Sequence, residues 1–181
     1  MKMTQVKLRP LSDTDLEHIL AWVNDNEVTG MYTRLKGKSA ADERAYISHE
    51  LRDKRERIYT IESAAGEYLG QVGLHEIDWS ARIARLSIII GNKREWGKGY
   101  GQAALVALVD KAFDEHGLER VYCFTREENA KMRHILGKLG FKEESVMMGA
   151  YEANGKAYDM VHYSMNAPKY EARPLLLRHA A

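Results

Sequence analysis

Hydrophobic positions follow two different spacings along this chain, one typical of strands and one typical of helices. Leu86–Ile90 is a continuous apolar run rich in β-branched side chains, which predicts a buried strand. From Ala104 to Ala112, apolar residues recur at helical spacing and predict a helix that ends at Gly117. The basic, glycine-rich segment Arg94–Gly101 joins the two elements. A strand, a glycine loop and a helix in this order are the central feature of the sequence.

The same two spacings divide the rest of the chain. Before the apolar run they predict a strand at Val6–Leu8, helices capped by Ser12 and Ser39, and a strand hairpin of Ile58–Glu62 and Tyr68–Ile77. After the glycine loop and its helix they predict a strand at Arg120–Thr125, a helix from Asn129 to Gly140, and a hairpin of Val146–Tyr151 and Lys156–Met165 across Asn154-Gly155. The charged run Arg52–Arg57 is interpreted as a solvated helix end. The order of elements is βααβββαβαββ, in one α/β domain over residues 1–166 with a tail over residues 167–181.

Composition and charge favour a soluble globular domain and argue against several kinds of partner. The 181 residues are 45% hydrophobic and 29% charged, which is ordinary for a soluble domain with an adequate core. A net charge of +1 argues against nucleic acid or an anionic membrane as a partner. The single cysteine, Cys123, excludes an internal disulfide, and no signal-like apolar segment follows Met1, so a cytoplasmic location is expected. The seven histidines have no zinc-like spacing, and no metal site is expected.

The glycine loop has the chemistry of an anion site. Glycines let the backbone approach an oxyanion closely, N–H groups at a helix start point toward it, and the helix dipole adds partial positive charge. Arg94 and Lys98 add two full charges, so a pyrophosphate is the predicted guest. A P-loop would need a different order around Lys98 and a hydroxyl residue, and here Gly99 follows the lysine. The interval of Gly97, Gly99 and Gly101 also differs from that of a dinucleotide fingerprint.

The spacing that remains, Arg94-x-x-Gly97-x-Gly99, resembles the loop of the GNAT N-acetyltransferase superfamily, which holds the pyrophosphate of acetyl-CoA. The resemblance extends along almost the whole chain. It is closest to the RimJ/RimL-like branch, which acetylates protein N-termini, and to the related spermidine N-acetyltransferases. The other segments that carry it are Ile88–Gly91, Trp96–Gly101, Glu128-Asn129, Lys138–Phe141, and Asn154-Gly155 followed by Tyr158-Asp159. It implies a mixed, mostly antiparallel sheet with flanking helices.

The resemblance also implies where acetyl-CoA, the expected co-substrate, binds. The central strand is expected to splay from its neighbour, and the backbone groups that hold the pantetheine arm are then those of Ser87, Ile88, Ile89 and Ile90. The loop residues expected around the pyrophosphate are Arg94, Glu95, Trp96, Gly97, Lys98, Gly99, Tyr100 and Gly101. Asn129 and Met132 are expected beside the pantetheine and the thioester, and Asn129 is equally suited to cap a helix.

The groups for proton transfer depart from the family pattern. The family's general acid is a tyrosine seven residues after Asn129, where Leu136 stands, and the branch often has a serine in place of Met132. Protonation of the thiolate by solvent is chemically acceptable because a thiolate is a good leaving group. Glu76 is the predicted general base, since related spermidine enzymes carry an acid there; a solvated strand end is an equally good interpretation. His75 is expected to point to the opposite sheet face.

The acceptor side is less defined. Trp22, Asn24 and Tyr32 lie where the family builds the acceptor wall, and Trp22 also suits a core. Tyr158 is expected to face the same groove. Arg85 stands where many relatives carry an acid, which weakens the case for a polycationic acceptor.

The predicted activity is acetyl transfer from acetyl-CoA to a primary amine, by direct attack in a ternary complex. The acceptor classes that stay open are a protein N-terminus, an amino sugar, an aminoglycoside and a polyamine, and a homodimer stays open as well. The alternative is a non-catalytic acyl-CoA-binding sensor, which Leu136 and Met132 favour because neither has a proton to give.

Overall fold

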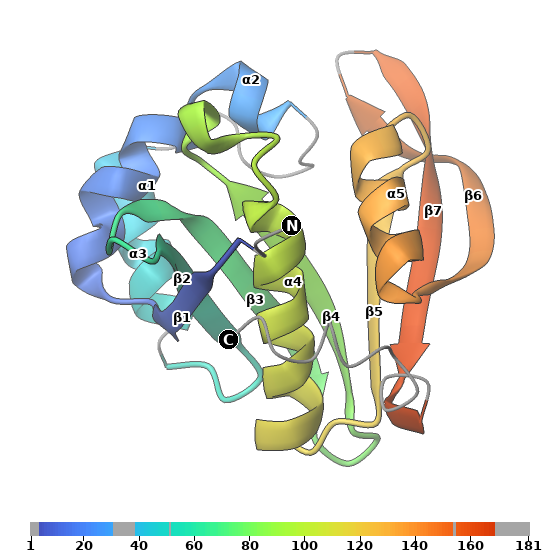
Figure 1. Ribbon diagram of the computed structural model, residues 1–181. Coiled ribbons are helices and arrows are strands. Elements are labelled where there is room, and N and C mark those ends of the chain that lie inside the picture. The colour runs from blue at the N-terminus through green and yellow to red at the C-terminus, as the bar shows by residue number, and fades with distance from the viewer. Residues whose placement is uncertain (1–3, 31–38, 51, 154, 169–181) are drawn as a thin grey trace.

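The structure, a computed structural model, describes residues 4–30, 39–50, 52–153 and 155–168. Its centre is a seven-stranded sheet with the strand order β1-β2-β3-β4-β5-β7-β6 (Figure 1). The strands are β1 (Val6–Pro10), β2 (Arg57–Ser63), β3 (Tyr68–Asp78), β4 (Ile83–Ile90), β5 (Arg120–Arg126), β6 (Lys142–Ala153) and β7 (Lys156–Asn166). Only β4 and β5 pair in parallel; the other neighbouring strands are antiparallel. The predicted mixed, mostly antiparallel sheet is confirmed.

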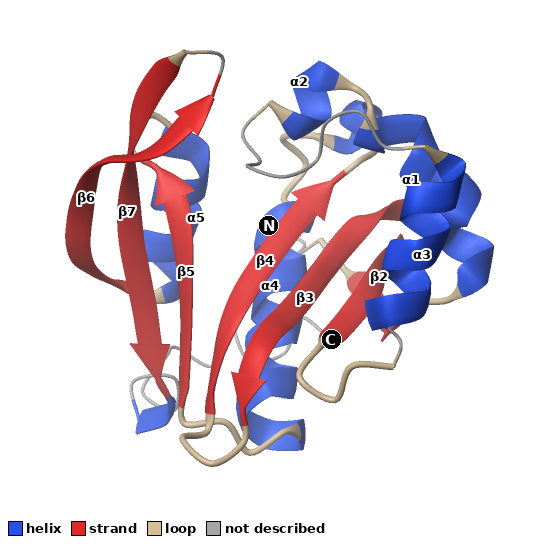
Figure 2. Ribbon diagram, turned by 180° about the vertical axis from the view of Figure 1, so that it is seen from behind, coloured by secondary structure: helices blue, strands red, loops and turns tan. Residues whose placement is uncertain are grey.

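Helices cover both faces of the sheet, as the two opposite views show (Figures 1 and 2). On one face lie α1 (Leu16–Val23) and α3 (Ala40–Glu50), with the short α2 (Asn26–Thr29) following α1; on the other lie α4 (Tyr100–Asp110) and α5 (Ala130–Leu139). The continuous apolar run of β4 follows from this arrangement. Leu86 belongs to the core cluster that contains α4, and Ile89 belongs to the cluster that contains α1 and α3. Both faces of β4 are therefore buried.

Local sequence signals explain where the helices next to the site begin and end. The side chain of Asn129 accepts a hydrogen bond from the N–H of Met132 at 3.2 Å, which caps α5. Gly140 ends the same helix in a left-handed conformation, with a φ of 86°. Gly99 has a φ of 88° at the start of α4, a conformation in which a side chain is strained.

The central strands diverge as they leave their common end. β4 pairs with β5 only over Ile83–Arg85, against Arg120–Tyr122. Beyond this short ladder β5 continues beside β7, while β4 continues beside β3, and a wedge opens between them (Figure 2). The expected splay of the central strand is present.

The charged run Arg52–Arg57 differs from its prediction. α3 ends at Glu50 and β2 begins at Arg57, so most of the run is a connection between a helix and a strand rather than a solvated helix end. Glu56 turns inward from this connection, and its side chain is only 12% exposed. At the other end of the chain, β7 ends at Asn166, and residues 169–181 lie outside the described part.

Candidate active site

A cavity of about 570 Å³ occupies the wedge between β4 and β5. The predicted site residues that line it are Glu76, Ser87, Ile88, Asn129 and Met132. They come from three elements, the bulge of β3, β4 and the start of α5, and the splay of the strands brings them together. The pairing of β4 with β5 stops at Arg85, so the following stretch of β4 presents its edge to this cavity. A strand edge of this kind is suited to bind an extended ligand that carries amide groups.

The glycine loop lies between the last residue of β4 and the first turn of α4. Its first part is a 3-10 helix, Lys93–Glu95, and the indole N–H of Trp96 donates to the carbonyl of Ile90 at 2.8 Å. The ammonium of Lys98 lies 2.9 Å from Glu95 Oε1, and this hydrogen bond raises the pKa of Lys98. The loop is thereby tied to β4, with α4 beginning directly after Gly99. The N–H groups of the first turn have no acceptor within their own helix.

Glu76 lies in a β-bulge at the end of β3. The register against β4 shifts between His75 and Asp78, and Glu76 has a φ of 54°, which is uncommon for a residue other than glycine. Glu76 Oε1 lies 3.2 Å from Arg85 Nη2, whereas His75 contacts Ser87, and Arg85 and Ser87 share one sheet face because they are two positions apart. The expectation that Glu76 and His75 face opposite sides is wrong, because the bulge breaks the alternation of the strand.

Tyr122 of β5 lies close to the same carboxylate. Its hydroxyl is 3.5 Å from Glu76 Oε2, a long contact. Burial, and then the negative charge of Glu76, raises the pKa of Tyr122, so its phenol stays protonated at neutral pH. Together, Glu76, Arg85 and Tyr122 place an anion, a cation and a neutral proton donor at one side of the wedge.

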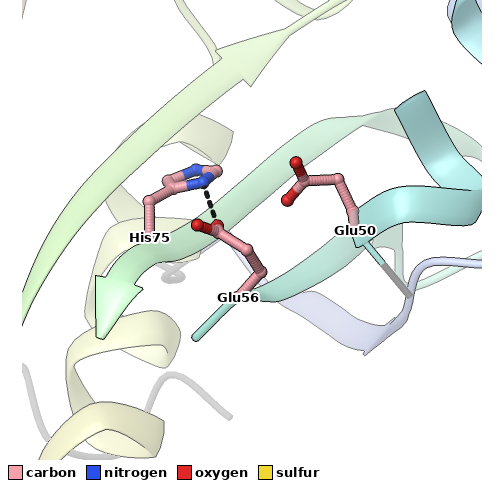
Figure 3. A group of neighbouring side chains, drawn as sticks. All are labelled: Glu50, Glu56 and His75. Atoms are coloured by element: carbon pink, nitrogen blue, oxygen red, sulfur yellow. Dashed lines mark hydrogen bonds and ion pairs between the residues drawn. The ribbon is translucent and has the colours of Figure 1, made fainter. Parts of the chain in front are cut away.

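His75 belongs to a second group of side chains, together with Glu56 and Glu50 (Figure 3). Its Nδ1 lies 2.6 Å from Glu56 Oε2, and its Nε2 lies 2.7 Å from the hydroxyl of Ser87. The other oxygen of Glu56 accepts the backbone N–H of Glu76 at 3.0 Å. Glu50 of α3 approaches the same carboxylate, and burial, followed by the charge of Glu56, raises the pKa of Glu50 to about 7. Sequence reasoning missed this group because its members are far apart in the chain.

Comparison with known proteins decides the family. The family model described as "Acetyltransferase (GNAT) domain" matches residues 5–142. The chain belongs to the GNAT acetyltransferase family. A spermidine N(1)-acetyltransferase of Vibrio cholerae is 26% identical over 92% of this chain and 96% of its own. A second, from Escherichia coli K12, is 29% identical over 92% of this chain and 89% of its own.

Solved structures agree with this placement. The crystal structure of spermidine N-acetyltransferase from Vibrio cholerae in complex with CoA and spermine superposes with a TM-score of 0.88, at 26% identity, over 92% of this chain and 98% of that one. This GNAT protein is therefore an acetyl-CoA-dependent N-acetyltransferase that acetylates amines, as predicted. The comparisons do not support the alternative of a non-catalytic sensor.

The position of the family's general acid is part of the core. Leu136 is fully buried among the residues beneath α5, and it does not line the cavity. Met132, one turn earlier, lines the cavity but has no proton to give. The hydroxyl of Tyr122, on β5, lies 3.5 Å from the carboxylate of the predicted base.

The predicted acceptor residues that the structure describes do not line the cavity. Trp22 is buried in the cluster under α1, where a Cβ on Gly91 would overlap its ring, so the prediction that it forms an acceptor wall is wrong. Asn24 is exposed at the end of α1, and Tyr32 lies outside the described residues. Tyr158 stacks on the guanidinium of Arg126, whose Cζ lies 4.1 Å from the ring centre, and it is not among the lining residues.

The β6–β7 hairpin supplies lining residues that the sequence analysis did not name. Met147, Ala150 and Tyr151 come from β6, and Met160 comes from β7. Strand periodicity marks such residues as alternating but does not say that a second strand pair will lie across the wedge.

No helix in the described residues is long and apolar enough to cross a membrane.

Proposed function

We propose that the acceptor of this acetyltransferase is an amine on a neutral or acidic carrier, such as a protein N-terminus or an amino sugar, and that Glu76 receives its proton. One observation carries the proposal. Among the described residues that line the cavity, the charged ones are Glu76, Arg85 and Arg126. Glu76 is already paired with Arg85 at 3.2 Å. The lining therefore has one paired carboxylate and two guanidinium groups, which disfavours a polycation.

We assign the acetyl-CoA site to the wedge and the glycine loop. The edge of β4 over Ser87–Ile90 suits the pantetheine arm, and Asn129 and Met132 lie across the wedge from it. The loop from Arg94 to Gly101 suits the pyrophosphate, because it ends in the N-terminus of α4 and carries basic side chains. Glu95 and Trp96 support the conformation of this loop through their contacts with Lys98 and Ile90.

Glu76 is placed to deprotonate the acceptor amine, which is mostly protonated at neutral pH. An amine has a pKa near 10 when it is lysine-like and about 8 at an N-terminus, so most of it is protonated and cannot attack. The Glu76 carboxylate, 56% exposed at the cavity, is placed to take that proton through a water molecule. The neutral amine then attacks the thioester carbon in the ternary complex, and the thiolate leaves.

A second candidate acceptor is a polyamine. Relatives that match over almost their whole length include spermidine N-acetyltransferases, and the superposed crystal structure contains spermine. The two candidates differ in the charge that the site must accommodate, so the same experiment separates them.

The test is an acceptor panel read by release of free thiol. Glucosamine, a short peptide with a free N-terminus, an aminoglycoside and spermidine are compared by kcat/KM with acetyl-CoA saturating. We expect glucosamine or the peptide to exceed spermidine by about tenfold or more, and Arg85→Glu to raise kcat/KM for spermidine by about tenfold, because it removes a repulsive charge and adds an attractive one.

Arg82→Glu makes the same change of charge outside the cavity lining and is the matched control. It should leave the ratio of the acceptors unchanged. If spermidine is the best acceptor of the unmodified protein, the polyamine candidate replaces the proposal.

A further inference from the structure

We propose that Ser87, His75 and Glu56 form a proton relay that takes a proton from the acceptor nitrogen as it is acylated. Ser87 lines the cavity, Nε2 of His75 lies 2.7 Å from its hydroxyl, and the carboxylate of Glu56 lies 2.6 Å from Nδ1 of His75. The proposal rests on the proposed amine acylation in this cavity. It concerns how a proton leaves the acceptor nitrogen.

The hydrogen bonds determine which nitrogen of His75 carries the proton. Burial favours the neutral form of Glu56, but hydrogen bonds from His75 and from the backbone N–H of Glu76 outweigh it and lower the pKa of Glu56. An ionised carboxylate only accepts hydrogen bonds, so Nδ1 of His75 is the protonated nitrogen and Nε2 is an acceptor. The Ser87 hydroxyl therefore donates to Nε2, which leaves its oxygen lone pairs able to accept a proton.

The strand pairing makes room for this line of groups. Gly73 is the register partner of Ser87 in the β3–β4 ladder, two positions before His75 on the same face. A Cβ at Gly73 would lie 2.9 Å from Nε2 of His75. Because Gly73 has no side chain, the imidazole can extend along β3 and reach the hydroxyl on the neighbouring strand.

Several charged or titratable groups surround the imidazole. Glu50 faces it from α3 and Glu56 from the turn before β2; Arg85 is its register partner on β4, and Glu76 follows it in its own strand. Glu56 and His75 are 12% and 13% exposed, so solvent does little to screen their interaction. Arg85 opposes a positive imidazole, but its charge is compensated by Glu76. Glu56 at Nδ1 compensates the positive charge that the ring gains when Nε2 takes a proton.

The proposed reaction takes two protons from the acceptor nitrogen, forms one C–N bond and breaks one C–S bond. The acceptor enters as an ammonium, and Glu76 passes its first proton through water to solvent. The neutral nitrogen attacks the thioester carbon, the C–N bond forms, and the nitrogen becomes cationic. It gives its second proton to Ser87 Oγ while the serine proton moves to His75 Nε2. The C–S bond then breaks with the electron pair on sulfur, solvent protonates the thiolate, and the imidazolium next to Glu56 later releases its proton.

The first test removes the members of the relay singly and together. We expect His75→Gln and Ser87→Ala each to lower kcat about 10²-fold for the best amine of the acceptor panel, with unchanged calorimetric affinity for acetyl-CoA. The double variant should be no slower than the slower single variant, because the groups act in one chain. His134→Gln, on the exposed face of α5, is the matched control and should retain full turnover.

The second test separates proton transfer from packing. His75→Gln should also lose the acidic limb of the pH–rate profile that a titrating base produces. Added imidazoles should restore turnover to His75→Ala in proportion to their basicity, which a structural role does not predict. Gly73→Ala keeps all three relay side chains but pushes the ring of His75 away from Ser87, so it should lower kcat in the same way while the fold is kept.

One measurement does not depend on the acceptor. Nitrogen NMR of histidine-labelled protein should show the Nδ1–H tautomer for His75, and Glu56→Gln should abolish that preference. Additive losses in the double variant, absence of rescue by imidazoles, or an Nε2–H tautomer would each overturn the relay. None of these results would change which amine the acceptor panel identifies. The relay and the proposed acceptor are therefore tested independently.

Discussion

A single unusual backbone conformation decides what the predicted base can do. Glu76 has a φ of 54° and its N–H is held by Glu56 Oε1 at 3.0 Å. Such a conformation persists only when surrounding contacts hold it in place. Here the bulge and the hydrogen bond from the N–H of Glu76 to Glu56 do so. The result is a carboxylate that faces Arg85 and the cavity instead of the sheet face that strand alternation assigns to it.

The variant Glu76→Gln tests the role of this carboxylate as a base. It keeps the shape of the side chain and removes its basicity, so kcat should fall about 10²-fold while the affinity for acetyl-CoA changes little. The defect should shrink as the pH rises, because more of the acceptor is already neutral. The measurement is kcat against pH, with binding followed by calorimetry.

Glu17→Gln is the control, since Glu17 is exposed on α1. If Glu76→Gln changes only the KM of the acceptor, the carboxylate binds the ammonium and is not the base. If no parameter moves, Glu76 is a solvated strand end.

At the scale of elements, the glycine loop and the first turn of α4 form one unit with β4. Gly99 needs its φ of 88°, so replacing it would strain the fold as well as the site. Gly101 does not have a positive φ, and a Cβ there would lie 3.8 Å from Ile90 Cγ1, an ordinary contact. Gly101 is therefore the position where a side chain can cover the helix N-terminus without strain.

We expect Gly101→Val to weaken acetyl-CoA binding at least about tenfold, because its branched side chain would shield the N–H groups that we propose bind the pyrophosphate. Gly137→Val is the matched control in α5, where a Cβ would meet nothing within 4 Å. Calorimetry with acetyl-CoA and with acetyl-pantetheine checks the assignment. Equal losses for both ligands, or no loss for acetyl-CoA, would place the pyrophosphate elsewhere.

At the scale of the molecule, one buried carboxylate connects the helical layer to the sheet. Asp15, just before α1, is 1% exposed and lies 2.6 Å from Arg9 Nη2 on β1. It also accepts hydrogen bonds from Thr60 of β2 at 2.8 Å and from the N–H of Ser12 at 3.0 Å. Burial alone would raise the pKa of Asp15, but the hydrogen bonds from Arg9, Thr60 and Ser12 outweigh it and hold that pKa below its ordinary value.

Asp15→Asn should lower the free energy of unfolding by about 3 kcal/mol at pH 7, because it leaves Arg9 partly uncompensated. A depressed pKa means that the folded state binds fewer protons than the unfolded state, so this contribution is present above about pH 4 and is lost as the pH falls further. Urea denaturation at pH 7 and at about pH 3 should therefore show a smaller difference at the lower pH. Asp13→Asn, at an exposed neighbouring position, should change stability by less than about 0.5 kcal/mol. An equal loss for both variants would contradict the role given to Asp15.

The order of the strands and of the longer helices, the glycine loop and the family were predictable from the sequence, but the short α2 was not. These features depend on neighbours in the chain: the apolar run of β4, the cap of α5 at Asn129 and its end at Gly140 are local signals with local physical causes. The loop spacing from Arg94 to Gly99 is equally local. Each was therefore predictable without knowledge of the packing.

Which side chains meet at the site depends on strand register and packing, and these were visible only in the structure. Helical periodicity places Trp22 on an apolar face, but contact with Gly91 is what makes it core rather than acceptor wall. Glu56 and His75 are separated by 19 positions, and His75 and Ser87 by 12, so their contacts depend on strand register. The bulge at Glu76 shifts that register, and a shift of one position moves a side chain to the other sheet face. Register and bulges result from the packing of the whole sheet, which no short stretch of sequence specifies.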